Sequence, residues 1–255
     1  MILAKIPAEI KTFTLEVPHH QDLPDVSAWM QQHHLQWPLI AKPDVGERGD
    51  HVRLLTSMTE VQQYALELKQ GFIIQEYLPW DFEAGVMVIR SPATGRVRIS
   101  SIVTKDFLKV TGDGRSSIKE LALAIPRSRF QITRLIQQGL NADRIPKVNE
   151  EVLLEPIGNH KRGTTFINGH NLYSPELQQL VERSIRQIPG FFFGRFDVKA
   201  PSAEAFKRGE GWKVMELNGA FSEPGHIYDP SEKLWRAWRD LILHWDALAV
   251  VSYEN

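Results

Sequence analysis

Two short segments in the last third of the chain alternate large apolar with polar residues, and they restrict the fold more than any other feature. They are residues 193–200 (FGRFDVKA) and 212–218 (WKVMELN). Such alternation is typical of strands with one buried and one open face, and the polar, glycine-containing stretch 202–211 between them predicts a surface connection. We therefore expect two neighbouring strands, which would form a hairpin.

In such a hairpin the polar residues of both strands point the same way. Arg195 and Asp197 share one face of the first strand, and Glu216 and Asn218 share one face of the second. Carboxylate and amide oxygens suit Mg²⁺, which takes few protein ligands and completes its shell with water and nucleotide phosphate. The guanidinium would neutralise the remaining charge. Alternation alone would equally place Asp197 and Glu216 on the polar face of a half-exposed sheet, so both interpretations stay open.

The composition excludes several classes of protein. A chain of 255 residues with 42% hydrophobic and 24% charged residues is an ordinary soluble globular protein, large enough for one extended domain or two lobes. Its net charge of -1 offers no basic field for nucleic acid, and the lack of cysteine excludes disulfides, thiolate nucleophiles and zinc–thiolate sites. The N-terminus lacks a secretory apolar core, and no run approaches the ~18 apolar residues of a membrane span. We therefore expect a cytoplasmic protein with neither nucleic acid nor membrane as partner.

A lysine before a glycine-bearing loop forms the first local signal. Residues 37–52 predict a buried strand that ends at Lys42, and then a loop in which Gly46 and Gly49 could bring backbone N–H groups against phosphate. The loop is not a Walker A motif, because G-x-x-x-x-G-K-[ST] is absent. A lone lysine at a strand end is usually solvated, so Lys42 becomes a candidate only in combination with later parts of the chain.

A break between two predicted strands lies in residues 72–90 (FIIQEYLPWDFEAGVMVIR). Pro79 interrupts the apolar run, and Glu83 opens the next strand. Backbone groups left unpaired by such a break can hydrogen-bond an adenine edge, and a carboxylate just beyond it can hold ribose hydroxyls. We therefore predict a nucleotide-binding linker between two lobes, made of Gln75, Glu76, Tyr77 and Leu78, with Glu83 after it.

These features occur in a fixed order: strand-Lys-Pro, glycine-bearing loop, helix, strand-Gln-Glu-x-Leu, a glutamate at a strand start, and finally Arg-x-Asp with Glu-x-Asn. In this order they resemble the ATP-grasp superfamily, in the branch of D-alanine–D-alanine ligase and cyanophycin synthetase. The resemblance covers the chain from about Trp37 to the C-terminal helix. It implies an α+β fold in which two lobes grip a nucleotide between mostly antiparallel sheets.

The resemblance also implies a role for each matching residue. It implies that Lys42 contacts the nucleotide phosphates, that Glu76 and Leu78 take the adenine edge, that Glu83 holds the ribose, that Arg195 meets the γ-phosphate, and that Asp197, Glu216 and Asn218 hold Mg²⁺ or Mn²⁺. Gln75 and Tyr77 belong to the same nucleotide-binding linker. ATP and a divalent cation are therefore the expected cofactors.

Two further cations are candidates for catalysis. In the family a lysine of this lobe reaches the transferring phosphate, which implies that role for Lys105, although a solvated strand lysine would look the same. Arg162 lies in a basic loop before Gly163 that resembles the family's Asn-x-x-x-Gly-Gly loop, with Thr164 in place of the second glycine. Facing a cleft, this arginine would bind the γ-phosphate or an acidic second substrate. An ordinary exposed loop would look the same.

The C-terminal segment departs from the family pattern. Amino-acid ligases of this fold carry Ser-Pro-Gly in the equivalent turn and use it to bind a substrate carboxylate, whereas the turn 219–230 here reads Ser222-Glu223-Pro224-Gly225, with Glu223 as an inserted acid and His226 directly after Gly225. Glu223 would repel a carboxylate and attract an amine, or would act as an extra metal ligand. The last helix repeats apolar residues at Leu234, Trp238, Leu241, Ile242, Trp245, Leu248 and Ala249, which predicts a core-facing stripe.

We expect three parts: an N-terminal lead-in (1–36), a small ATP-grasp lobe (37–80) and a large lobe with the metal site (81–255). Relatives carry an additional domain before the grasp, and only about 36 residues precede the Lys42 strand here. This leaves open a fragment that lacks an N-terminal domain, a homodimer or another partner, and a shorter architecture.

The function expected from the sequence is that of a Mg²⁺–ATP-dependent carboxylate–amine ligase. ATP would phosphorylate a small-molecule carboxylate, and an amine would displace phosphate from the acyl phosphate. A kinase-like ATP-grasp phosphotransferase and a non-catalytic ATP-binding module are the alternatives. Asp197→Asn or Glu216→Gln is expected to abolish turnover and to leave the melting temperature within a few degrees, because these side chains would serve the ion.

Overall fold

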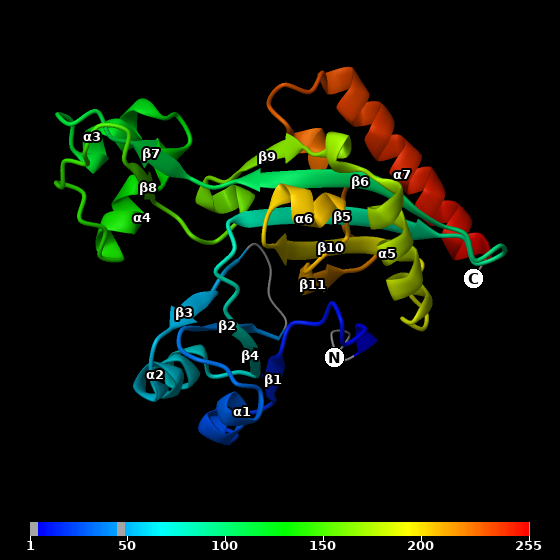
Figure 1. Cartoon of the computed structure of the whole chain (residues 1–255), viewed down its shortest axis with the longest axis horizontal. Helices are drawn as coiled ribbons and strands as arrows, with labels where there is room; N and C mark the ends of the chain where they lie inside the picture. Colours follow the sequence, from blue (N-terminus) through cyan, green and yellow to red (C-terminus); the bar gives the residue numbers. More distant parts are fainter. Residues whose placement is uncertain (1–4, 45–48, 255) are drawn as a thin grey trace.

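A computed structural model describes residues 5–44 and 49–254, so Gly46 lies outside the described residues. Figure 1 shows a large sheet at the centre, a smaller sheet below it and a compact unit projecting to one side. The sheet orders are β1-β4-β2-β3, β11-β10-β5-β6-β9 and β7-β8. Every pairing between these strands is antiparallel, in agreement with the expected α+β architecture.

The smaller lobe begins earlier in the chain than expected. It contains β1 (Thr14–Val17), α1 (Val26–Gln32), β2 (Leu39–Pro43), β3 (Arg53–Leu55), α2 (Met58–Leu68) and β4 (Phe72–Glu76). Strand β1 pairs with β4 along its whole length, and Trp29 of α1 packs in the same apolar cluster as Leu39 and Ile74. Residues 14–36 therefore differ from the expected lead-in, because their apolar side chains complete the core of this lobe.

The large sheet contains the hairpin that alternation predicts. Its strands are β5 (Phe82–Arg90), β6 (Val97–Asp106), β9 (Thr165–Asn168), β10 (Phe193–Ala200) and β11 (Lys213–Asn218). Strand β10 pairs with β11 so that Arg195 lies opposite Asn218 and Asp197 lies opposite Glu216. The connection between them contains a short helix, α6 (Ala203–Lys207). One face of the sheet packs with α5 (Pro175–Arg186) and α6 in the main core, which leaves the face of Arg195 and Asp197 for other contacts.

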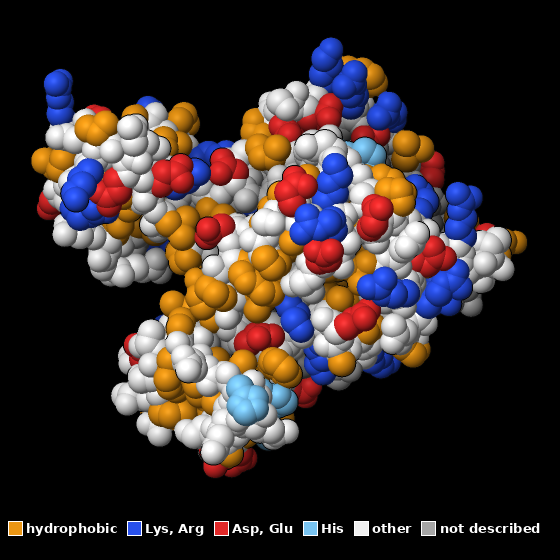
Figure 2. Space-filling view, in the orientation of Figure 1, with side chains coloured by type: hydrophobic (Ala, Val, Ile, Leu, Met, Phe, Trp, Pro, Cys, Tyr) orange, Lys and Arg blue, Asp and Glu red, His pale blue; other side chains and the backbone are white. Residues whose placement is uncertain are grey.

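A third unit projects from the large sheet between β6 and β9. It contains β7 (Lys109–Thr111), α3 (Ile118–Ala124), α4 (Ile132–Gln137) and β8 (Glu151–Leu153), and it has its own apolar cluster. Its first helix starts at a capping box, in which Ser117 Oγ accepts from the Glu120 amide and the Glu120 carboxylate accepts from the Ser117 amide. Figure 2 shows a deep indentation in the outline of the molecule between this unit and the smaller lobe.

The C-terminal helix α7 (Leu234–Glu254) lies along the outer edge of the molecule (Figure 1). The expected core-facing stripe is wrong for most of its length: Trp238 and Trp245 are 54% and 53% exposed, and only His244 and Val251 of this helix are fully buried. The helix packs through Ala247, Leu248 and Val251, and of these only Leu248 belongs to the expected stripe. Among the described residues, no helix combines the length and apolar character that a membrane span requires.

Candidate nucleotide and metal site

One face of the large sheet carries a cluster of charged side chains in register across adjacent strands. Asp197 lies opposite Gly85 on one side and Glu216 on the other, and Lys199 lies opposite Glu83. The lack of a side chain at Gly85 makes room for its neighbours. A Cβ at this position would lie 3.1 Å from Arg195 Cδ and 2.8 Å from a Val103 methyl. The antiparallel register thus gathers side chains that are far apart in the sequence.

Lys105 on β6 connects two of the carboxylates in this cluster. Its Nζ lies 2.5 Å from Glu83 Oε1 and 3.6 Å from Asp197 Oδ2, and all three side chains are nearly inaccessible to solvent. Burial acts to lower the pKa of Lys105, but Glu83 and Asp197 outweigh it and raise that pKa above its ordinary value. Gly158 of a neighbouring loop covers the ion pair, since a Cβ there would lie 2.7 Å from Glu83 Oε1. Lys105 is therefore a buried, charged group and not a solvated strand lysine.

Arg195 holds Asp197 through two hydrogen bonds. Its Nε donates to Oδ1 at 2.8 Å and its Nη2 donates to Oδ2 at 3.4 Å. Burial would raise the pKa of Asp197, yet Arg195 and Lys105 hold it below its usual range. In return, Asp197 raises the pKa of the Arg195 guanidinium. Asp197 is therefore ionised at neutral pH and is enclosed by two cations.

Glu216 and Asn218 are the other two predicted oxygen donors, and their side chains have fewer polar contacts within the chain than that of Asp197. Glu216 is exposed, and the buried Asn218 Nδ2 has no hydrogen-bond partner among the described residues. The two carboxylates at opposed positions and the amide oxygen of Asn218 are donors of the hard-oxygen type that Mg²⁺ takes, whereas the free Nδ2 is a hydrogen-bond donor that suits a phosphate oxygen. Within residues 5–44 and 49–254, no three His, Asp or Glu side chains gather as a metal site, so water or phosphate would have to complete the shell.

Lys42 and Gln75 link the smaller lobe to β11. Lys42 Nζ donates to Met215 O at 2.8 Å, and Gln75 Nε2 donates to the same carbonyl at 3.2 Å. Burial lowers the pKa of Lys42, although the nearby carboxylates of Glu216 and Asp197 oppose this effect. The two sheets therefore approach each other at Met215. Lys42 lies close enough to Glu216 and Asp197 for their negative charges to act on its pKa.

The predicted linker runs from the end of β4 to β5, and its groups already have partners. Glu76 Oε1 accepts from the Phe13 amide at 2.9 Å, so this carboxylate is tied to the smaller lobe. The carbonyls of Leu78 and Trp80 accept from Lys199 Nζ at 3.3 and 2.8 Å. Tyr77 is partly buried. Lys199 thus anchors the linker to β10, a role not expected from the sequence, although the alternation of residues 193–200 places Lys199 on the face of Asp197.

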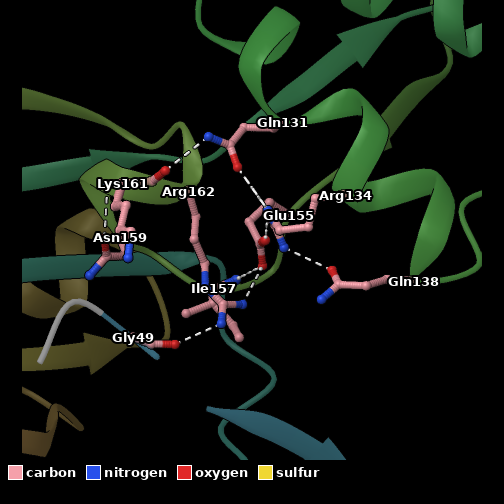
Figure 3. A network of polar contacts seen from close by, with 9 residues as sticks. All are labelled: Gly49, Gln131, Arg134, Gln138, Glu155, Ile157, Asn159, Lys161 and Arg162. Carbon is pink, nitrogen blue, oxygen red and sulfur yellow. Dashed lines mark hydrogen bonds and ion pairs between the residues drawn. The ribbon is translucent and has the colours of Figure 1, made fainter. Parts of the chain in front are cut away.

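Arg162 joins the basic loop to a buried acid and to the smaller lobe (Figure 3). Its Nη1 lies 3.5 Å from Glu155 Oε1, and its Nη2 donates to Gly49 O at 2.6 Å. Glu155 also binds Arg134 of α4 at 2.6 Å and is only 2% exposed. Nothing in the local sequence distinguishes Glu155 from an exposed acid, so the sequence carries no signal that would have found it. Through these contacts the basic loop of Arg162 is connected to α4 in the third unit and to Gly49 in the smaller lobe.

The turn after β11 lies over the end of the charged cluster. The Glu223 carbonyl accepts from Arg195 Nη1 at 3.3 Å, and the Glu223 carboxylate accepts from the hydroxyl of Tyr228. Burial and this carboxylate raise the pKa of Tyr228 to about 12. His226 has other partners: its Nδ1 lies 2.7 Å from Ser101 Oγ and its Nε2 lies 3.1 Å from Asp240 Oδ2. Glu223 therefore borders the site, and His226 fastens the turn to β6 and α7.

No family model matches the sequence, and no curated protein matches it. Among solved structures, the D-alanine–D-alanine ligase of Bacillus anthracis is 13% identical, with a TM-score of 0.50 over 96% of this chain and 62% of that one. The D-alanine-D-alanine ligase of Coxiella burnetii is 8% identical, with a TM-score of 0.50 over 97% and 54%. These likenesses show the fold. This chain has the ATP-grasp fold.

The superfamily resemblance drawn from the motifs is therefore confirmed at the level of the fold. A bifunctional glutathione synthetase of Pasteurella multocida is also similar, at 16% identity and a TM-score of 0.48, with 93% of this chain covering 34% of that one. This ATP-grasp chain thus spans about a third to three fifths of the length of these solved structures.

Proposed function

We propose that this ATP-grasp chain supplies the nucleotide-binding part of a Mg²⁺–ATP-dependent ligase that joins a small carboxylate to an amine. The observation that supports this most strongly is the charged cluster, in which Lys105 and Arg195 enclose Asp197 on a sheet face that Lys42 approaches from the other lobe. A purely structural sheet face gains little from several cations and carboxylates at its centre, because each buried charge must be desolvated. Perturbed charges of this kind gather at functional sites.

Asp197, Glu216 and Asn218 are the residues we assign to the divalent cation, either Mg²⁺ or Mn²⁺. When bound, the ion would neutralise phosphate charge and polarise the oxygens of the transferring group. Asp197 keeps its negative charge at neutral pH because its pKa is lowered. Glu216 is exposed and so can reach a ligand without first losing a buried partner.

The three cations are assigned to the phosphates of ATP. Lys42 would hold the phosphates from the smaller lobe, and Lys105 and Arg195 would donate to oxygens of the transferring phosphoryl group. Each charge-assisted hydrogen bond is worth roughly 1.5–3 kcal/mol, and such preformed donors stabilise the transition state of phosphoryl transfer. Arg162, held by Glu155 against Gly49, would complete the cationic rim on the side of the basic loop.

The nucleoside is assigned to the linker between the lobes. The backbone of Glu76 and Leu78 would face the adenine edge, with Gln75 and Tyr77 beside it, in which case the Glu76 amide and the Leu78 carbonyl must give up or share their bonds with Phe13 O and Lys199 Nζ. Glu83 would hold the ribose, in which case its ion pair with Lys105 must open or be shared, since Lys105 occupies Oε1. In this arrangement the carboxylate of the first substrate attacks the γ-phosphorus and ADP leaves. The amine then attacks the acyl carbon, and inorganic phosphate leaves.

The first experiment measures ADP release by the purified chain with Mg²⁺–ATP, amino acids and small carboxylates, with hydroxylamine present to trap acyl phosphates. ADP together with hydroxamate is the expected result, and it should disappear in the Glu216→Gln variant. ADP without hydroxamate would replace the ligase by a phosphotransferase. ATP binding without ADP would replace it by a nucleotide-binding module.

A further inference from the structure

The outward face of α7 carries a regular stripe of large apolar side chains, which we call the α7 stripe. Trp235, Trp238, Ile242 and Trp245 succeed one another at intervals of three, four and three residues. Residues at this spacing lie on one side of a helix, and it is the spacing of a coiled-coil seam. Trp235 and Ile242 are 58% and 50% exposed, and both other members are exposed to a similar degree, so the stripe faces solvent along its whole length.

Other residues of α7 already hold the helix in place. Val251 packs with Met87 and Phe193, and Ala247 and Leu248 pack against the same cluster. His244 Nε2 lies 3.0 Å from Ser100 Oγ of β6. Because these contacts attach α7 to the large sheet, the core of the chain does not explain the size of the tryptophans in the α7 stripe.

The exposed apolar area is large enough for a small interface. Leu234 and Tyr253, which are 73% and 94% exposed, lie within about 60° of the stripe around the helix, whereas Leu243 and Val250 lie about 100° or more away from it. At about 100 Å² for each half-exposed side chain, the six residues on this side present about 600 Å² per chain, so two copies would together bury about 1,200 Å², the lower end of the range for specific interfaces. An apolar patch of this size is at the upper end of what monomers expose, about 300–600 Å².

The charges beside the α7 stripe favour a second copy of the same helix. Arg239 precedes Ile242 by three residues and Asp246 comes four residues after it. If two copies pair in opposite directions about a two-fold axis near Ile242, Arg239 of each copy faces Asp246 of the other, and Trp238 lies beside Trp245. A parallel pairing would instead bring like charges together. Arg239 pairs with Asp240 of its own helix, whereas Asp246 has no ion pair among the described residues and is available to the second copy.

We propose that the α7 stripe binds the α7 stripe of a second copy of this chain, so that the protein is a two-fold dimer with antiparallel α7 helices. An isologous contact of this kind is closed, because each copy gives and receives the same surface. The dimer is independent of the proposed ligase activity, since no residue of the stripe belongs to the charged cluster.

The test compares molar masses by sedimentation velocity across a dilution series. The unaltered chain is expected to be a dimer and Ile242→Glu to be a monomer, because the variant places an unpaired carboxylate from each copy in an apolar contact near the axis. Phe130→Glu is the matched control: Phe130 is 86% exposed but lies in the third unit, so this variant should remain a dimer. Phe130→Glu should melt at the temperature of the unaltered chain, and Ile242→Glu should melt lower only by the contribution of the dimer, because neither side chain is buried in the chain itself.

A charge reversal tests the antiparallel arrangement. Asp246→Arg places arginine opposite arginine and should weaken the dimer at least tenfold, and the double variant Arg239→Asp, Asp246→Arg should restore it. A chain that is monomeric at every concentration overturns the proposal and assigns the stripe to a different partner. A dimer that survives Ile242→Glu overturns it as well, because the interface then lies elsewhere.

Discussion

Replacing Asp197 by asparagine should destabilise the folded chain strongly, in contrast to the same chemical change at Glu216. The Asp197 carboxylate receives two hydrogen bonds from Arg195 and lies 3.6 Å from Lys105 Nζ. Its neutralisation leaves the largely buried Arg195 without its ion-pair partner, while Lys105 keeps Glu83 at 2.5 Å, and breaking a buried ion pair costs about 3–5 kcal/mol. For a chain of this size, about 2–4 °C is lost per kcal/mol, so the melting temperature should fall by about 6–20 °C.

Glu216→Gln is the matched control, since it changes a carboxylate to an amide at the position opposite Asp197. Glu216 is exposed, so the expected change in unfolding free energy is within about 0.5 kcal/mol. The sequence alone predicted small changes for both variants, and only the structure separates them. Both should lose Mg²⁺-dependent ADP release if the proposed function holds.

Thermal and urea unfolding of the three proteins measure this difference, and its pH dependence checks the cause. The folded pKa of Asp197 is lowered, so its stabilisation is present above the ordinary pKa of about 3.9 and is lost as pH falls through the folded value. The gap between the unaltered chain and Asp197→Asn should therefore close in acid. Equal melting temperatures at neutral pH, within about 2 °C, would refute the assigned ion-pair geometry.

Three other results are expected. Lys42→Met should weaken ATP binding at least tenfold by calorimetry while Lys69→Met, at the exposed end of α2, leaves it unchanged, and equal affinities would remove Lys42 from the phosphate site. Ser117→Ala should lower the unfolding free energy in urea by about 1 kcal/mol through loss of the α3 cap; no change would mean that the cap is replaced by water. Glu155→Gln should raise the KM for ATP, since Arg162 loses its buried anchor, whereas Glu151→Gln should not; equal KM values would show that Arg162 is positioned by other contacts.

The apolar alternation of residues 193–200 and 212–218 was sufficient to predict the hairpin and the shared face of Arg195 and Asp197. Alternation is a local property, because successive side chains of a strand point to opposite faces. The order of the motifs was likewise sufficient to predict the ATP-grasp fold. Lys42 was placed correctly near the end of its strand, β2.

The tertiary structure decided which of these groups meet. The sequence could not distinguish Lys105, a candidate for catalysis, or Glu155 from a solvated side chain, and both side chains are buried because strands and loops from distant parts of the chain close around them. The C-terminal helix shows the same limit. Apolar residues lie on more than one of its sides, so the helical period could not tell which side packs on the sheet. In the folded chain Leu248 and Val251 pack against the large sheet, and the three tryptophans of the helix are exposed to solvent.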